Sequence, residues 1–144
     1  MNRRLFKDAI LRFAEAQRMS DLLDGLRVLL LEDEPLIAMD VEQLCLDNGA
    51  AEVITVRALE EIDPQAAVSS VDVAIVDLML NGVSTLDFAR RLQQGGKPFV
   101  FASGHSDADE VQASFPEVAF VAKPYAGADL VNAVAAACGR LSPA

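Results

Sequence analysis

The chain has 144 residues, of which 52% are hydrophobic, 24% are charged and only 6% are aromatic. This length and balance predict one compact domain that can bury a core without disulfides or structural metals. The net charge of −10 argues against nucleic acid as a general partner, because phosphate backbones need surfaces rich in lysine and arginine.

Residues 1–25 are expected to form an N-terminal helical extension whose charge differs from that of the rest. The first 18 residues hold five basic and two acidic side chains, a net charge of +3, which leaves −13 for the remainder. Phe6, Ile10 and Phe13 recur at helical spacing, which predicts an amphipathic helix. Such a helix can pack on the domain, form a dimer, dock a partner or bind a membrane surface weakly. Its modest charge favours packing or dimerisation.

Residues 26–144 are predicted to form the domain itself. Met19 precedes this unit and is a second candidate for the natural start of the protein. No apolar stretch approaches the length of a membrane span, and charged side chains within residues 7–15 interrupt any signal-peptide core. We therefore expect a cytoplasmic protein with no stable membrane insertion. Cys45 and Cys138 lack metal-binding spacing, so both are interpreted as reduced thiols.

Apolar runs alternate with helical patterns along this domain. Strands are expected over residues 27–31, 52–56, 71–77, 98–103 and 118–122. Helices are expected over residues 35–47, 59–62, 107–113 and 127–140, and between a cap at Ser84 and Gly95. Pro64 either ends the second of these helices or starts another turn.

This alternation predicts an α/β fold. Each gap between strands leaves room for one crossover helix, so the strands should run parallel, with right-handed crossovers and helices on both faces. The expected product is a doubly wound, flavodoxin-like sheet of five parallel strands in the order 2-1-3-4-5, with an extra N-terminal helix. That order places the first and third strands side by side.

Acidic side chains follow these two central strands. The third strand ends in Asp77, and Glu32, Asp33 and Glu34 follow the first strand. Because the carboxyl ends of parallel strands meet at one edge of the sheet, we expect these carboxylates to lie close together. Crowded carboxylates repel one another unless a positive group separates them, and Mg²⁺ prefers hard oxygen ligands of this kind. The pattern therefore predicts a magnesium site.

A hydroxyl and an amine end the other two strands at this edge. The fourth strand ends in Ser103, and Lys123 follows the fifth. Asp77 can attack a phosphoryl group while Ser103 and Lys123 each hold one of its other oxygens. Taken alone, most of these residues are more simply explained as helix caps, turn formers or surface charges. Their joint placement at successive strand ends favours a phosphoryl site.

Four stretches, in the right order, resemble the receiver domain of two-component response regulators over about residues 26–140. They are VLLLEDEP (28–35), VAIVDL (73–78), FASG (101–104) and FVAKP (120–124). The resemblance implies that Asp77 is the phosphoacceptor and that Asp33 binds Mg²⁺ directly. It also implies that Glu32 supports the ion, partly through water, and that the main-chain carbonyl of Met79 is a further ligand.

The resemblance also implies which residues respond to phosphorylation. Ser103 would be the switch hydroxyl, Lys123 would pair with a phosphoryl oxygen, and Phe120 would be the switch aromatic. The bond between Lys123 and Pro124 is expected to be cis. The chain departs from the commoner pattern where Glu32 replaces aspartate and where Ser103 replaces threonine.

Two further residues bear on the lifetime of a phosphoryl group. The resemblance implies that the side chain of Met79, two residues beyond the acceptor, flanks the phosphoryl group, where a hydrophobic side chain would shield the acyl phosphate from water. We therefore expect slow self-dephosphorylation. His105, the only histidine, is interpreted as a loop residue rather than a metal ligand or phosphodonor.

We therefore expect a single-domain response regulator that accepts a phosphoryl group on Asp77 from a histidine kinase or histidine phosphotransfer protein. It would act as a switch for an unknown downstream protein, not as an enzyme beyond its own phosphorylation and dephosphorylation. The alternative is a receiver-like interaction module that works without phosphorylation. A haloacid-dehalogenase-like hydrolase is disfavoured because it expects a second aspartate where Met79 stands. A homodimer through the N-terminal helix, or through the face built by the elements of residues 107–140, stays open.

Overall fold

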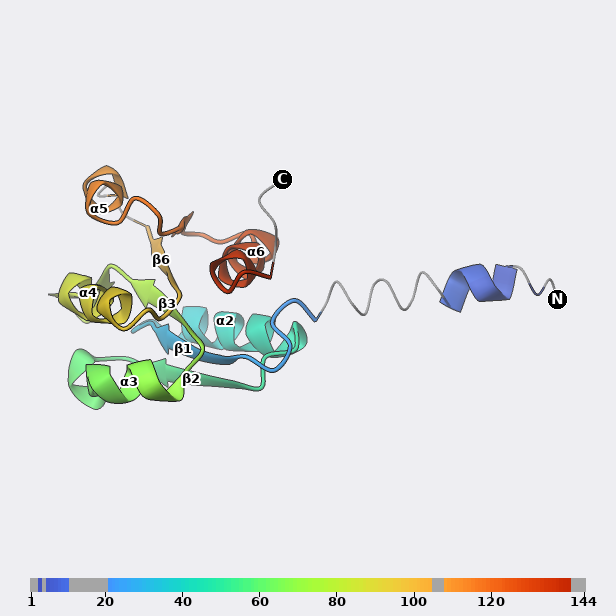
Figure 1. Ribbon diagram of the computed structural model, residues 1–144, viewed down its shortest axis with the longest axis horizontal. Helices are drawn as coiled ribbons and strands as arrows, with labels where there is room; N and C mark the ends of the chain where they lie inside the picture. The colour runs from blue at the N-terminus through green and yellow to red at the C-terminus, as the bar shows by residue number, and fades with distance from the viewer. Residues whose placement is uncertain (1–2, 4, 11–20, 105–107, 141–144) are drawn as a thin grey trace.

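The computed structural model describes residues 3, 5–10, 21–104 and 108–140. They fold around a five-stranded parallel sheet in the order β2-β1-β3-β6-β7 (Figure 1). Its strands are β1 (Arg27–Leu31), β2 (Glu52–Val56), β3 (Val73–Asp77), β6 (Phe99–Ser103) and β7 (Phe120–Ala122). In chain order this is 2-1-3-4-5, so the predicted α/β topology is confirmed.

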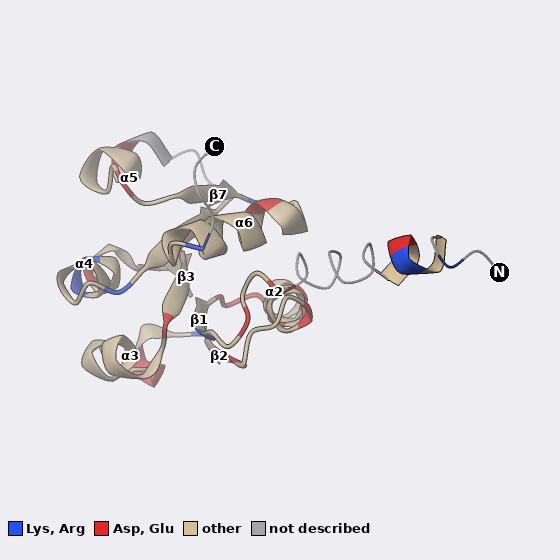
Figure 2. Ribbon diagram, turned by 45° about the vertical axis from the view of Figure 1, so that its right-hand side comes forward, with Lys and Arg blue, Asp and Glu red and all other residues tan. Residues whose placement is uncertain are grey.

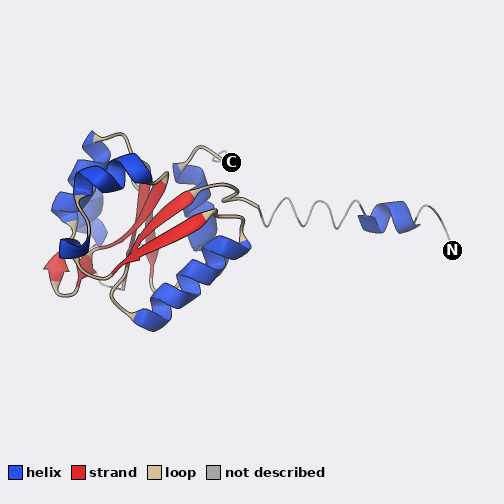
Figure 3. Cartoon of the chain, turned by 90° about the horizontal axis from the view of Figure 1, so that it is seen from below, coloured by secondary structure: helices blue, strands red, loops and turns tan. Residues whose placement is uncertain are grey.

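Helices cover both faces of this sheet (Figure 3). They are α2 (Pro35–Asp47), α3 (Pro64–Ser70), α4 (Leu86–Gln94), α5 (Ala108–Ser114) and α6 (Gly127–Ala137), with a 3-10 turn, η1 (Leu59–Glu61). One core lies between the sheet and the pair α2 and α6, and a second lies between the sheet and α3, α4 and α5.

The central strand β3 contributes to both cores. Val73 and Ile75 belong to the core under α2 and α6, whereas Ala74 and Val76 belong to the other. This follows from the two-residue period of a strand, whose successive side chains point to opposite faces. Every residue of β3 is buried, as expected for a central strand of a parallel sheet with helices on both sides. Only its end at Asp77 opens toward a polar site.

Helix α2 covers the residues that were predicted for it. Pro35 occupies its first turn, where the missing N–H removes no helical hydrogen bond. At the other end the side chain of Asn48 donates to the carbonyl of Leu44 (2.8 Å). Ala38, Val41 and Cys45 face the core. The helix therefore starts directly after the acidic loop that follows β1.

Of the two alternatives for Pro64, the structure has the second, because Pro64 starts α3 and the Asp63 carboxylate caps its first turn by accepting a main-chain N–H. One helix begins at another residue than predicted. Thr85, and not Ser84, immediately precedes α4, although the Ser84 hydroxyl does accept the first helical N–H (3.3 Å). The closing helix ends at Ala137, three residues earlier than predicted.

A small hairpin follows β3 where only a loop was predicted. Its strands are β4 (Met79–Leu80) and β5 (Val83–Ser84), which pair antiparallel. Asn81 and Gly82 form the turn with φ of +53° and +80°. Positive φ at both central residues is the geometry that an Asn-Gly pair favours in two-residue hairpins. The turn holds the residues after Asp77 close to the end of the sheet.

The extra N-terminal helix is present at residues 5–10, while residues 11–18 of the prediction lie outside the described chain. Leu5, Phe6 and Ile10 on this helix are 67%, 57% and 50% exposed. Within the described residues, no helix is long and apolar enough to cross a membrane. Cys45 and Cys138 are both free thiols.

Candidate functional site

Three carboxylates meet at the carboxyl edge of the sheet. Glu32 and Asp33 follow β1, and Asp77 is the last residue of β3, which pairs in parallel with β1. One carboxylate oxygen from each of the three lies within 4.8 Å of the others. The predicted crowding of these acids is therefore present. Glu34, the fourth acid of the predicted group, is exposed at the rim.

Two of these carboxylates are almost completely buried. Glu32 is 2% exposed and Asp77 is 7% exposed, whereas Asp33 is partly exposed. Buried carboxylates are costly unless hydrogen bonds or opposite charges stabilise them. The site must therefore supply partners for both.

Lys123 supplies a charged partner to both buried acids. Its Nζ donates to Glu32 Oε1 (2.6 Å) and to Asp77 Oδ2 (2.8 Å), and its side chain is 16% exposed. The Lys123–Pro124 peptide bond is cis, as expected. The main-chain N–H of Lys123 also donates to the carbonyl of Ser103 (2.9 Å), which ties β7 to the end of β6.

Burial and charge act against each other in this cluster. Burial raises the pKa of the Glu32 carboxyl above its usual value, and the hydrogen bond and charge of Lys123 oppose that rise. Burial alone would lower the pKa of the Lys123 amine, but its hydrogen bonds to Asp77 and Glu32 raise that pKa above the usual value. The amine therefore stays charged at neutral pH and can neutralise negative charge in the pocket.

Main-chain N–H groups orient the carboxylates. Asn81 donates to Asp33 Oδ2 (3.2 Å), and Glu34 donates to Glu32 Oε2 (3.3 Å). The first of these bonds joins the hairpin to the loop before α2, across 48 residues of sequence. Because the acids are held by backbone as well as by Lys123, their geometry is set before any ligand arrives.

Thr85 is a residue of this site that the sequence did not reveal. Its side chain is fully buried, and its hydroxyl donates to the main-chain carbonyls of Asp77 and Leu78. It therefore fixes the backbone that carries the central carboxylate. In sequence a threonine before a helix is typical of a helix cap, but here the hydroxyl makes no cap hydrogen bond. The Asn81-Gly82 pair is a sequence signal for a hairpin turn, and such a turn brings the chain at Thr85 back toward Asp77.

The remaining predicted residues lie around this cluster. Ser103 ends β6 and is 1% exposed, next to β3 in the sheet. Phe120 starts β7 and is partly buried, with its ring 6.3 Å from that of Phe101. Met79 is 42% exposed on the hairpin, where its N–H lies 3.5 Å from Asp77 Oδ1. His105 falls outside the described residues.

These groups open into a cavity of about 290 Å³. Its described lining residues are Glu32, Asp33, Glu34, Ile37, Asp77, Met79, Gly82, Gly104 and Lys123. The three clustered carboxylates and the amine of Lys123 are thus all among the groups that line it. Hard oxygen ligands in such a pocket fit Mg²⁺, which keeps part of its water shell. The residues present therefore fit both a divalent cation and a small anion such as a phosphoryl group.

Comparisons with known proteins agree with the predicted fold and family. Residues 28–135 match the sequence profile of the response regulator receiver domain. A response regulator receiver protein from Burkholderia phymatum has a similar structure (TM-score 0.70, 22% identity, 83% of this chain and all of the other). None of the curated proteins matches the chain in sequence.

Two more solved structures resemble the chain. A putative response regulator from Chloroflexus aurantiacus has a TM-score of 0.69 at 24% identity, and the match covers 81% of this chain and all of the other. The response regulator PhyR from Brucella abortus has a TM-score of 0.65 at 25% identity, covering 91% of this chain but only 54% of that protein. At these identities the likeness concerns the fold, and function must be argued from the site.

Proposed function

The chain belongs to the response regulator receiver domain family, and on that premise we propose that Asp77 accepts a phosphoryl group with the help of Mg²⁺. The phosphoryl group would come from a histidine kinase or a histidine phosphotransfer protein. The chain is a phosphoacceptor switch and not a catalytic enzyme. The observation that carries the proposal is the cluster of Glu32, Asp33 and Asp77 around the amine of Lys123.

In this proposal Asp77 is the nucleophile. One of its carboxylate oxygens forms a bond to phosphorus while the bond between phosphorus and the imidazole nitrogen of the donor breaks. The electron pair of the broken bond stays on that nitrogen, and the imidazole leaves as neutral histidine because its other ring nitrogen carries a proton. Because the transition state of such a transfer is loose, the site contributes mainly positioning and charge.

Asp33 and Glu32 would hold the cation together with Asp77 and the main-chain carbonyl of Met79. The ion, when bound, neutralises charge on the attacking carboxylate and on the phosphoryl oxygens. Glu32 already accepts hydrogen bonds from Lys123 and from the main chain, which suits a role through a metal-bound water. The Asn81 N–H keeps Asp33 turned toward the pocket.

Lys123 and Ser103 would hold the transferred group. The amine of Lys123 donates a hydrogen bond to the Asp77 carboxylate before the phosphoryl transfer and would donate to a phosphoryl oxygen afterwards. The hydroxyl of Ser103, at the end of the adjacent strand, would turn toward another phosphoryl oxygen. Phe120 on β7 would follow that movement, so the surface of β7 and the neighbouring helices would change for a downstream protein.

Intact-protein mass spectrometry after incubation with acetyl phosphate and Mg²⁺ tests the proposal. We expect a gain of about 80 Da, the mass of one phosphoryl group, that is absent in Asp77→Asn and absent when the cation is chelated. Circular dichroism of Asp77→Asn checks that the fold is retained. Folded wild-type protein that gains no mass in excess Mg²⁺ would contradict the proposal and favour a phosphorylation-independent interaction module.

A further inference from the structure

One side of α2 exposes large apolar side chains. Leu36, Met39 and Leu46 are 77%, 61% and 48% exposed. At 100° per residue they point away from the side that buries Val41 and Cys45. We call the surface around Leu36, Met39 and Leu46 the outer face of α2. Exposed apolar side chains gathered on one helix face are typical of a surface that another element covers.

The outer face is also acidic. Asp40 and Asp47 are exposed beside the apolar side chains, and α2 contains no lysine or arginine. Figure 2 shows red but no blue on this helix. An occupant that is apolar on one side and basic beside it would therefore match the outer face in both respects.

The N-terminal helix has those properties. Leu5, Phe6 and Ile10 are at least 50% exposed on residues 5–10, and Ala9 lies on the same side of the helix. The exposed Lys7 stands beyond one edge of that apolar side, and the exposed Asp8 stands beyond the other. The first 18 residues carry a net charge of +3 against −13 for the rest of the chain, so the attraction extends beyond single pairs.

We propose that the N-terminal helix of the same chain docks on the outer face of α2. Leu5, Phe6 and Ile10 lie against the exposed apolar side chains of α2. Lys7 lies near the acidic residues at the edge of that face. Each surface leaves apolar groups in water when alone, and docking removes both from water at once.

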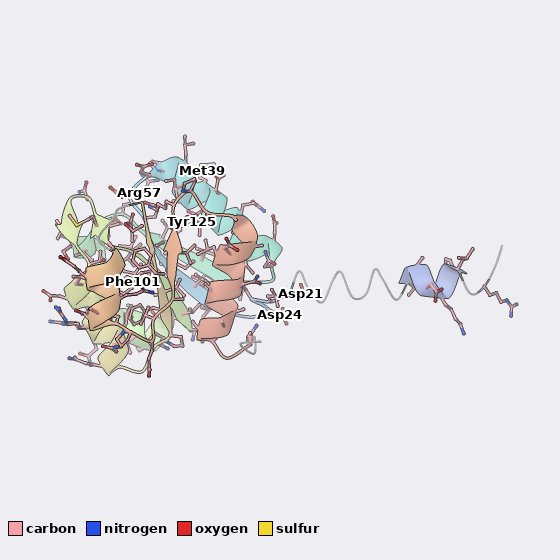
Figure 4. The ribbon with its side chains drawn as sticks, turned by 90° about the horizontal axis from the view of Figure 1, so that it is seen from above. Asp21, Asp24, Met39, Arg57, Phe101 and Tyr125 are labelled. Atoms are coloured by element: carbon pink, nitrogen blue, oxygen red, sulfur yellow. The ribbon has the colours of Figure 1, made fainter. Side chains whose placement is uncertain are left out.

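The path of the chain favours docking within one molecule over docking on a second copy. The N–H of Leu23 donates to the carbonyl of Asn48 (2.9 Å), and that of Gly25 donates to Gly49 (3.0 Å). The chain therefore enters the domain beside the C-terminal end of α2, near the labelled Asp21 and Asp24 of Figure 4.

The segment that connects the N-terminal helix to the domain is long enough for the helix to reach α2. Helix α2 has 13 residues and is about 20 Å long. Residues 11–20 can reach at most about 35 Å, so the N-terminal helix can meet any part of the outer face. A tether of this length gives an effective concentration of about a millimolar, well above the micromolar concentration of free copies in an ordinary experiment.

Docking would also bear on the phosphoryl site, a consequence that rests on the proposed function, whereas the docking itself does not. Leu36 lies two residues beyond Glu34, which lines the cavity of the three carboxylates. The docked helix would therefore stand beside the opening of that cavity. A protein that delivers a phosphoryl group along α2 would have to displace it.

Disulfide trapping in the full-length chain tests the docking. In a Cys138→Ser background we introduce Ala9→Cys and Gln43→Cys, two exposed positions in the middle of the two faces that leave the apolar side chains intact. Oxidised glutathione accepts the two electrons released when the thiols join. Cys45 can stay, because it is 1% exposed and burial raises its pKa to about 12, which keeps the thiol protonated.

We expect an intramolecular disulfide that forms about tenfold faster than in the control pair Asp8→Cys and Gln43→Cys, whose first cysteine lies on the other side of the N-terminal helix. The rate should not depend on protein concentration. Adding Phe6→Asp should slow the reaction to the rate of the control. Equal rates for the two pairs would overturn the proposal. Covalent dimers that form faster at higher protein concentration would also overturn it, in favour of a second copy.

Discussion

The three-carboxylate pocket and the outer face of α2 lie next to each other but are built in opposite ways. In the pocket, charged groups are buried and are held by Lys123 and by main-chain N–H groups. On the outer face, apolar groups such as Leu36 are left exposed. Most residues obey the rule that apolar groups are inside and charges outside. The pocket and the outer face of α2 both break this rule, in opposite directions, and to them we assign chemistry and docking.

The largest effect that separates these regions is expected from Lys123→Ala. The change leaves Glu32 and Asp77, whose side chains are 2% and 10% exposed, without their shared cation. We expect the free energy of unfolding without Mg²⁺ to fall by about 3 kcal/mol. Urea denaturation measures it. Glu32→Gln added to this variant should recover part of the loss, because one of the two buried charges is then removed. An unchanged free energy would show that the pocket is hydrated and that the ion pairs contribute little.

A smaller effect is expected from Thr85→Val, which keeps the shape of the side chain but removes its hydroxyl. The carbonyl of Asp77 would lose the hydroxyl as a buried donor, whereas the carbonyl of Leu78 keeps the hydrogen bond from the main-chain N–H of residue 85. We expect a loss of about 2 kcal/mol in the free energy of unfolding, and slower phosphorylation of Asp77 because its backbone is less fixed. Thr85→Ser keeps the donor and is the matched control. Equal losses in both variants would assign the effect to packing instead.

A surface ion pair provides a reference for the buried one. Arg27 donates from its main chain and its side chain to Asp72, and these hydrogen bonds lower the pKa of that carboxyl. A lowered pKa stabilises the fold above the ordinary value of 3.8, and this stabilisation is lost as the pH falls through the folded value. Because the Asp72 side chain is 35% exposed and its charge is screened by solvent, Asp72→Asn should cost only about 0.5 kcal/mol at pH 7. Urea denaturation at pH 7 and at a series of pH values below 3.8 checks this. A difference between the wild type and Asp72→Asn that does not shrink as the pH falls would contradict the assignment.

The smallest effect on stability is expected on the outer face of α2. Met39 is 61% exposed (Figure 4), so in the Phe6→Asp background, where the N-terminal helix should not dock, Met39→Gln should change the free energy of unfolding by less than about 0.5 kcal/mol. Thermal and urea unfolding measure it. A loss above 1 kcal/mol would show that this side chain supports the fold itself, and the contrast with the pocket would then fail.

Much of this arrangement could be predicted from the sequence because the main strands are continuous apolar runs. Asp77 and Lys123 were placed correctly, since each stands at or just after the end of such a run and the topology brings the strand ends together. The bounds of α2 also agreed, because Pro35 and the pair after Asp47 mark them clearly.

The parts that could not be predicted depend on contacts between distant residues. The strands of the hairpin have only two residues each, too few to show an alternation of apolar and polar side chains. The Asn81-Gly82 pair was therefore its only sequence signal. The hydrogen bond from Lys123 to Glu32 joins residues 91 positions apart, and no local sequence pattern predicts which of the acidic side chains accepts it. The role of Thr85 appears only once that hairpin turns the chain back toward Asp77.

The proposed function depends most on which of the three crowded acids accepts the phosphoryl group. Borohydride reduces an aspartyl phosphate to homoserine, so reduction after acetyl phosphate and Mg²⁺ treatment, followed by peptide mass spectrometry, reads the acceptor directly. We expect conversion at Asp77 alone. Conversion at Asp33, or none in a protein that has gained the mass of a phosphoryl group, would contradict it.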